Sequence, residues 1–581
     1  MQTVLSEYKE LTKRYLRPQL TKILILLMIV LIGSGLQLLV PQIVRYFIDL
    51  ATSGIFQDSL LTTAILFIAV AVASQMVNIL ANYIAQNLAW SATNELRSDI
   101  AAHCLNMDMT FHNSRTPGEM IERVDGDVSV LANFFSQFYV QILNNLVFIV
   151  GVLVILYFEN WSVGILFTFF ITATLFVVNK VRNIGVPFWG ESRQASANLY
   201  GFIEERLGGI EDVKSSGATS FVMKRFYELL RVKLLRDRKA YTVGVSVWAS
   251  TVGFFTIGTA LALGVGAYFY QKGQMTIGSV YLLYSYVQML RMPIEQISRQ
   301  FQDFQKASAS IKRTVELLRT KSLIQDGKGI SFPEGPLSIE FNNVHYSYKD
   351  GEKVLEDISF HLEPGKVMGL LGRSGSGKTT IMRLLYRFYD PSAGSVKIGN
   401  TDIRDVRLKE LRNVVGLVTQ DVQLFKGTIR DNVAIFDSQI TDEVIIQAFK
   451  ELELESWFRQ LPDGLDTKIG PGGEGLSAGE SQLLALTRMF IRNPKILIFD
   501  EVSSRLDPVT EKLVTKVCEK LLKGRTGIII SHRLAILEIV ENILILENGE
   551  ILEFGDKEDL QGDPNSTFYK LIATEREGVL Q

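Results

Sequence analysis

The stretch GRSGSGKTT, residues 372–380, fits the pattern G-x-x-x-x-G-K-[ST] and follows an apolar run at 367–371 that predicts a buried strand. In such a strand-loop-helix unit the glycines let backbone N–H groups point inward, and the N-terminus of the helix favours an anion. We expect Lys378 to reach the β and γ phosphates of a nucleotide and the Thr379 hydroxyl to ligate Mg²⁺. The residues assigned to this phosphate loop are Gly372, Ser374, Gly375, Gly377, Lys378, Thr379 and Thr380.

Two acidic residues end a second apolar run, KILIFDE at 495–501. Carboxylates at the C-terminal end of a strand face the ligand crevice of an open α/β sheet. We expect Asp500 to hold Mg²⁺ through water. Glu501 would orient and deprotonate the attacking water in phosphoryl transfer. A solvated strand end is the simpler alternative.

His532 follows a third apolar run, TGIIIS at 526–531. A neutral imidazole at this position would hydrogen-bond the γ-phosphate and hold the attacking water. Because a lone histidine is more often structural, the catalytic assignment depends on the presence of the other motifs.

Taken together, these motifs resemble one family, the ATP-binding cassette (ABC) transporters. The resemblance implies that Gln420 in GLVTQ is the Q-loop residue, which senses Mg²⁺ and the membrane domain. It also implies that Tyr348 in VHYSY stacks on the adenine of ATP. LSAGE at 476–480 would be the signature motif, usually LSGGQ, in which Ser477 and Gly479 contact nucleotide.

The composition indicates a membrane protein, because 581 residues with 47% hydrophobic content are too apolar for an ordinary soluble chain. The apolar excess lies in the first half of the sequence, where six candidate spans are near or above the roughly 20 residues needed to cross a bilayer. Buried helices of a soluble protein are the alternative. The six spans lie at about 21–48, 60–88, 133–157, 161–181, 243–270 and 276–299.

The distribution of basic residues predicts the orientation of these spans, since cytoplasmic flanks carry the excess of lysine and arginine. The loops at 49–59 and 158–160 have neither residue, and the third outer loop has only Lys272. We therefore expect a multi-pass protein of the cell membrane. Both termini and the nucleotide-binding domain should lie in the cytoplasm. The apolar run from Ile23 lacks a small-residue cleavage pattern and should remain as the first span. The flank before it carries Lys9, Lys13, Arg14, Arg17 and Lys22.

Cysteine content and net charge restrict the function further. Only Cys104 and Cys518 are present, both predicted on the reducing side, so neither a disulfide framework nor a cysteine metal site is expected. A formal net charge of -2 gives no indication of nucleic-acid binding.

Two polar inner segments, 110–128 and 202–217, resemble the loops that end in coupling helices in exporters of this family. A generic pair of solvated helices is the alternative for each. A stretch rich in glycine and proline then reads as a linker. We predict an α-helical six-span transmembrane domain at 1–318, a linker at 319–336, and an α/β P-loop nucleotide-binding domain at 337–581.

The chain resembles half a transporter, because the family works with twelve spans and two cassettes. Each ATP lies between the phosphate loop of one cassette and the signature of the other. Ala478 replaces the first glycine of the signature pair, which adds a methyl near the phosphate and would strain the backbone if a positive φ were needed there. Glu480 replaces glutamine, Pro471 replaces a usual glutamate, and Arg505 makes the D-loop at 504–507 SRLD instead of SALD. Neutral drift is the alternative explanation.

An intact Glu501 beside an altered signature resembles one subunit of family members with two unequal ATP sites. We therefore favour a heterodimeric exporter, in which a partner's signature completes the hydrolysing site and LSAGE completes a slow one. The run QLLALTR at 482–488 also resembles those heterodimers. A homodimer, a lipid flippase or an importer on the same fold are the alternatives, whereas a soluble cassette is opposed by the six spans.

The expected partners are the lipid bilayer, a second subunit and a transported small molecule, lipid or peptide. Polar residues in the spans either line a substrate cavity or form hydrogen bonds between helices. Arg291 and Glu295 lie one turn apart beside Pro293 and are costly in lipid, so they are candidates for function or for a salt bridge. The other polar residues are Gln37, Gln42, Asn78, Asn82, Asn144, Asn145 and Gln288.

Overall fold

The computed structural model describes residues 9–53, 57–348, 351, 353–503, 506–531 and 537–578. The chain divides into two compact units. The first, which we call the helical unit, comprises Met1–Asn106 and Arg115–Lys321. The second, the sheet unit, comprises Met107–Ser114 and Ser322–Gln581.

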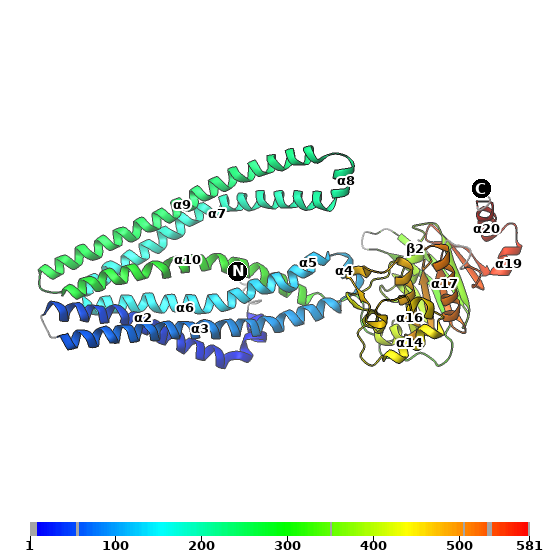
Figure 1. The fold of residues 1–581 in the computed structure, drawn as a ribbon, viewed down its shortest axis with the longest axis horizontal. Helices are drawn as coiled ribbons and strands as arrows, with labels where there is room; N and C mark the ends of the chain where they lie inside the picture. The colour runs from blue at the N-terminus through cyan, green and yellow to red at the C-terminus, as the bar shows by residue number, and fades with distance from the viewer. Residues whose placement is uncertain are drawn as a thin grey trace. The chain divides into compact units, whose positions relative to one another are not determined.

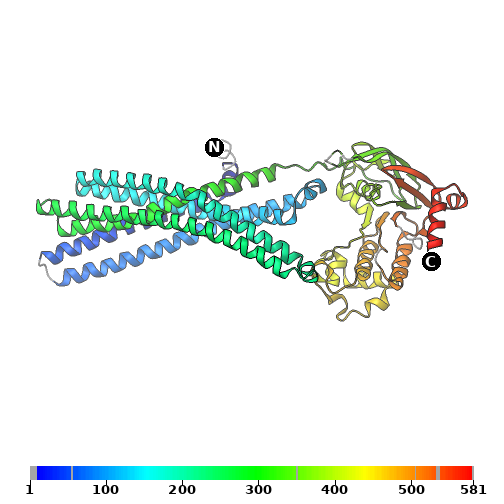
Figure 2. The ribbon, with the colours of Figure 1, turned by 90° about the horizontal axis from the view of Figure 1, so that it is seen from above.

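Long helices make up the helical unit, and Figure 1 shows them running alongside one another. Helix α2 packs along α3, and α10 packs against α6 and α9. Helices α7 and α9 stay side by side in both views and are joined by the short α8 (Figures 1 and 2). The long helices are α2 (Leu20–Thr52), α3 (Gln57–Leu105), α6 (Val128–Glu159), α7 (Trp161–Gly208), α9 (Thr219–Gln271) and α10 (Ile277–Arg319). The short ones are η1 (Thr12–Leu16), η2 (Arg17–Gln19), α5 (Pro117–Ile121), η3 (Glu122–Asp127) and α8 (Ile210–Ser215).

Five helical stretches of the described chain are long and apolar enough to cross a membrane. They contain α2, α3, α6, α7 and α9 and coincide with the first five predicted spans. The sixth predicted span falls on α10, which is of sufficient length but less apolar, and which carries the Arg291 to Glu295 ion pair (3.2 Å) within one turn. The count of six spans therefore remains a prediction.

Several of the polar residues predicted in the spans form hydrogen bonds between helices. Asn144 in α6 accepts a hydrogen bond from Ser34 in α2 (2.7 Å), and Asn145 donates one to Gln296 in α10 (3.0 Å). Gln288 in α10 donates one to Thr259 in α9 (2.9 Å). These contacts favour a packing role for the three side chains, since paired polar groups hold apolar helices together.

The sheet unit is built on a six-stranded sheet with the order β12-β11-β3-β10-β9-β6. The strands from β11 to β6 are parallel, and β12 pairs antiparallel with β11. Ile529 of β10 packs on one face, whereas Ile528 and Ile530 pack on the other, so both faces are covered as a parallel sheet requires. The strands are β3 (Val367–Gly372), β6 (Val415–Val418), β9 (Ile496–Asp500), β10 (Thr526–Ile530), β11 (Asn542–Glu547) and β12 (Glu550–Asp556).

A second, antiparallel sheet has the order β2-β1-β4-β5, and β7 pairs with β8. These strands are β1 (Ile339–Ser347), β2 (Lys353–Leu362), β4 (Ala393–Ile398), β5 (Thr401–Asp402), β7 (Gly427–Thr428) and β8 (Lys468–Ile469). The helices of the sheet unit are α4 (Met109–Asn113), α11 (Lys378–Leu385), α12 (Leu408–Val414), α13 (Ile429–Ala434), α14 (Asp442–Glu451), α15 (Glu455–Phe458), α16 (Ala478–Arg492), α17 (Pro508–Leu522), α19 (Lys557–Gly562) and α20 (Thr567–Gly578), with η4 (Gly464–Asp466) and η5 (Pro471–Gly473).

Candidate nucleotide-binding site

The phosphate loop connects β3, a central strand of the six-stranded sheet, to α11. Gly377 caps the start of α11 with φ +107°, a conformation that a side chain disfavours. A Cβ atom at Gly377 would also lie 2.5 Å from Leu355 Cδ2, and one at Gly372 would lie 2.3 Å from the Leu546 carbonyl oxygen. The shape of the loop therefore depends on glycine at both positions.

Lys378, the first residue of α11, is only 6% exposed and points into its own loop. Its Nζ donates hydrogen bonds to the carbonyl oxygens of Gly372 (2.6 Å) and Arg373 (3.0 Å). Burial lowers the pKa of Lys378, while the charges of Glu501 and Asp500 act in the opposite direction. The ammonium is thus held by neutral carbonyl groups, and a phosphate would offer it anionic partners that bind it more strongly.

The predicted carboxylate pair, Asp500 and Glu501, lies where β9 ends. Burial raises the pKa of Asp500 to about 6, and the adjacent Glu501 charge adds to the shift. Glu501 has φ +49°, which is uncommon for a residue with a side chain, and its N–H donates to the Ile530 carbonyl of the neighbouring β10 (2.9 Å). Gln420 Nε2 donates to Glu501 Oε2 (2.9 Å). The structure therefore brings Gln420 onto the carboxylate expected to act on water.

Tyr348 lies beside the phosphate loop as part of a tyrosine cluster, which we define as Tyr346, Tyr348 and Tyr389. Its ring meets Tyr346 edge-to-face at 5.0 Å and Tyr389 at 5.6 Å. Its hydroxyl is 3.4 Å from Thr380 Oγ1 and accepts a hydrogen bond from Arg383 Nη1 (3.1 Å). The cluster lines a cavity of about 480 Å³, so the proposed adenine-stacking residue and the loop are adjacent. No motif in the sequence predicted Arg383 as part of this site.

The signature motif forms the start of α16. Ser477 Oγ accepts the Glu480 N–H (3.2 Å), and Glu480 Oε2 accepts the Ser477 N–H (2.7 Å), which together form a capping box. The second carboxylate oxygen of Glu480 accepts a hydrogen bond from the Trp457 indole (2.9 Å). Burial alone would raise the pKa of Glu480, but these hydrogen bonds outweigh it and lower that pKa. Glu480 therefore has a structural role that sequence reasoning missed.

Ala478 is the first residue of α16 and has helical backbone geometry. The backbone strain that a positive φ would have caused at Ala478 is therefore not present. The methyl group of Ala478 is exposed beside Ser477. The next residue, Gly479, is buried against α17, where a Cβ would lie 2.3 Å from Thr510 Cγ2. Glycine at 479 thus serves helix packing. His532, Ser504 and Arg505 lie outside the described residues.

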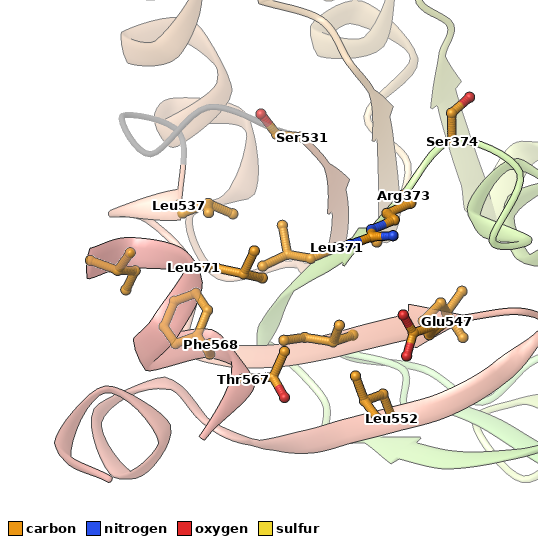
Figure 3. Close-up of a pocket in the computed structure, with 14 residues that line it drawn as sticks. Leu371, Arg373, Ser374, Ser531, Leu537, Glu547, Leu552, Thr567, Phe568 and Leu571 are labelled. Atoms are coloured by element: carbon orange, nitrogen blue, oxygen red, sulfur yellow. The ribbon is translucent and has the colours of Figure 1, made fainter. Parts of the chain in front are cut away.

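A second cavity, of about 640 Å³, lies beside the start of the phosphate loop, with walls from β11, β12 and α20 (Figure 3). These walls are mainly apolar and include Leu371 and Phe568. Of the predicted site residues, Gly372 and Ser374 line it, whereas the carboxylate pair is not among its described lining. Among the described residues, the cavity therefore adjoins the phosphate loop without including Asp500 or Glu501.

A phosphate loop on the same chain as long apolar helices is the arrangement of a membrane transport ATPase. Comparison with known proteins agrees. The family described as ABC transporter transmembrane region matches residues 23–294, and the family described as ABC transporter matches residues 355–504. A putative multidrug export ATP-binding/permease protein of Staphylococcus aureus (strain NCTC 8325 / PS 47) is 30% identical over 571 residues, which cover 94% of this chain and 97% of that protein.

Two further relatives extend the comparison. The uncharacterized ABC transporter ATP-binding protein YwjA of Bacillus subtilis (strain 168) is 29% identical over 91% of this chain and 92% of its own length. The structure of a bacterial Atm1-family ABC exporter with ATP bound shares the fold, with a TM-score of 0.80 at 24% identity, over 96% of this chain and 98% of that one. The chain belongs to the ABC transporter family and is of the exporter type. It is an ATP-binding, multi-pass membrane ATPase coupled to transport, with a cytoplasmic nucleotide-binding domain.

Proposed function

We propose that this chain is one subunit of a heterodimeric exporter with one hydrolysing and one slow ATP site. The contrast between its two half-sites carries the proposal. On the phosphate-loop side, Gln420 contacts Glu501 and Lys378 lies in the loop. On the signature side, Ala478 places an exposed methyl at the start of α16. The intact half would hydrolyse ATP with a partner's signature, and the altered half would complete the slow site.

The methyl group of Ala478 lies at the N-terminus of a helix, where backbone N–H groups can bind an anion. The Glu480 N–H is capped by Ser477 Oγ, whereas the N–H groups of Ala478 and Gly479, at the first two positions of α16, would be offered to the phosphate of a nucleotide bound by the partner. The Ser477 hydroxyl lies at the same helix end. A side chain at 478 occupies space that glycine leaves free, so phosphate approaches less closely and its charge is stabilised less.

In this proposal each site residue has a defined role. Tyr348 stacks on adenine, and the loop glycines with Ser374, Lys378 and Thr380 bind phosphate. Glu501 is the general base, and His532 assists it. Thr379, Gln420 and Asp500 offer the oxygen ligands that Mg²⁺ prefers. Mg²⁺ would supply neutralisation of the phosphate charge.

In this proposal residues 1–318 form a six-span transmembrane domain, 319–336 a linker and 337–581 the ATP-binding cassette. ATP binding and hydrolysis by the paired cassettes drive alternating access of the pathway that the two transmembrane domains share. The transported compound is a small molecule, a lipid or a peptide that reaches the pathway from the cytoplasm or the bilayer.

The test compares the chain alone with the chain co-expressed with candidate partner subunits. ATPase activity and transport are measured in inside-out vesicles, and Glu501→Gln in each preparation sets the background. We expect high turnover and transport only when a partner is present. If the chain alone matches the best pair in both measurements, the protein is a homodimer and the heterodimer proposal is wrong.

A further inference from the structure

The side chain of Gln482 connects the signature helix to the Q-loop residue. Gln482 lies in α16, five positions after Ser477, and is 5% exposed. Its Nε2 donates to the backbone carbonyls of Gln420 (2.8 Å) and Thr419 (3.4 Å). These two residues directly follow β6, at the point where the chain leaves the sheet.

The connection continues to the carboxylate pair. The side chain of Gln420 donates to Glu501 Oε2 (2.9 Å). Gln482 therefore binds the backbone of Gln420, and the side-chain amide of Gln420 in turn binds the Glu501 carboxylate. Because Glu501 follows the last residue of β9, the sequence of contacts runs from α16 through the Q-loop residue to the end of the sheet.

The orientation of the Gln482 amide is fixed by its two carbonyl acceptors. Its Oε1 is buried and meets no hydrogen-bond donor among the described residues. A buried oxygen without a donor is unfavourable, and an apolar side chain would avoid this. The neighbours Leu483, Leu484 and Leu486 are apolar and buried in this same helix. The N–H groups of Gln482 are therefore the reason for an amide at this position.

We infer that Gln482 is a positioning residue that sets the Gln420–Glu501 contact from the signature helix. Since α16 is one continuous helix, a shift of Ser477 on contact with the partner's nucleotide moves Gln482 and hence the Q-loop residue. Hydrolysis at this chain's own site then depends on how its signature is engaged at the other site. The inference rests on the role of Glu501 given under the proposed function.

The test uses Gln482→Leu in the full-length transporter, with ATPase activity measured at varied Mg-ATP concentration. We expect kcat to fall about tenfold, as for a member of a coupled hydrogen-bond network, while KM for ATP stays within about twofold. An unchanged KM also shows that the variant is folded and binds ATP. Thr487→Val is the matched control, because Thr487 is buried in the same helix and its hydroxyl donates to the Leu483 carbonyl one turn earlier.

A double-mutant cycle separates positioning from a general packing effect. In a Gln420→Ala background, Gln482→Leu should cause no further loss of kcat, because the side chain that Gln482 positions is already absent. Three results would each overturn the inference: Gln482→Leu retains the wild-type kcat, Thr487→Val loses as much kcat as Gln482→Leu, or the losses from Gln482→Leu and Gln420→Ala add. Glu501→Gln is measured in parallel. If Glu501→Gln retains ATP turnover, the proposed function itself is wrong. If Glu501→Gln loses turnover while Gln482→Leu keeps the wild-type rate, only the inference is wrong.

Discussion

Asn113 in α4 donates a hydrogen bond from Nδ2 to the hydroxyl of Tyr389 (2.6 Å), although 276 positions separate the two residues. Tyr389 meets Tyr348 edge-to-face, with ring planes at 88°. A segment that lies between two long helices in the sequence is thus anchored on the tyrosine cluster within the sheet unit.

We expect Asn113→Leu to uncouple ATP hydrolysis from transport. The change removes one hydrogen bond, which contributes about 1 kcal/mol, while the apolar side chain leaves Tyr389 buried. Transport per ATP hydrolysed should fall about fivefold, with little change in basal ATPase activity. Parallel transport and phosphate-release assays measure this ratio. Asn106→Leu is the control, because the Asn106 side chain is exposed and donates to the Ala102 carbonyl four residues earlier. An unchanged ratio in Asn113→Leu would contradict the expectation.

Glu501→Gln should abolish most turnover and leave ATP binding intact. Loss of a general base reduces the rate by on the order of 100-fold or more. The glutamine keeps the size of the side chain and can still contact Gln420, so the loop should hold its shape. Steady-state ATPase assays with binding of a fluorescent ATP analogue measure both quantities. Retained turnover would refute the assigned role.

Asp500→Asn should leave the nucleotide-free protein as stable as the parent, or more stable, at pH 8. The pKa of Asp500 is raised to about 6 in the folded protein from 3.8, so folding favours the protonated form. That contribution is present at low pH and is lost as the pH rises through 6, which leaves the ionised carboxylate destabilising at pH 8.

The measurement is the apparent Tm between pH 5 and pH 8, without nucleotide and with Mg-ATP. The advantage of Asp500→Asn over the parent should shrink towards pH 5. The stabilisation by Mg-ATP should be largely lost in the variant at every pH. A variant that is less stable than the parent at pH 8 without nucleotide would show that the ionised carboxylate supports the fold.

Glu480→Gln should weaken the start of α16. Both carboxylate oxygens accept hydrogen bonds, one from Ser477 N–H and one from Trp457, and an amide can accept only on one side. We expect a loss of about 1 kcal/mol, which is the usual contribution of a helix cap. The apparent Tm of the nucleotide-binding domain should fall by roughly 2–4 °C. Ser481→Ala, which affects an exposed hydroxyl on the same turn, should change it little.

The sequence predicted the parts of the site that lie within short patterns. The phosphate loop and the carboxylate pair each follow an apolar run, and the structure places both at the carboxyl ends of parallel strands, β3 and β9, which lie on either side of β10. The contacts of Trp457 with Glu480 and of Asn113 with Tyr389 join residues 23 and 276 positions apart, so no local pattern records them. Only folding brings such partners together.

Helix lengths illustrate the same limit in the helical unit. The predicted span at 243–270 covers the apolar part of α9, yet the helix has 53 residues and begins at Thr219. Residues 219–242 lie outside that span because lysine and arginine residues are interspersed among their apolar residues. In α10, conversely, Arg291 and Glu295 reduce the apolar character of a helix that the sequence assigned to the membrane.

The hydrogen bonds of Glu480 change the interpretation of the two differences between LSAGE and the usual LSGGQ. Of the two substitutions in that motif, one maintains the start of the helix through two hydrogen bonds to its side chain. The other adds a single carbon atom, at Ala478, on an undistorted backbone. In the proposed heterodimer, the inequality of the two ATP sites would therefore rest in part on one methyl group, which the single substitution Ala478→Gly removes.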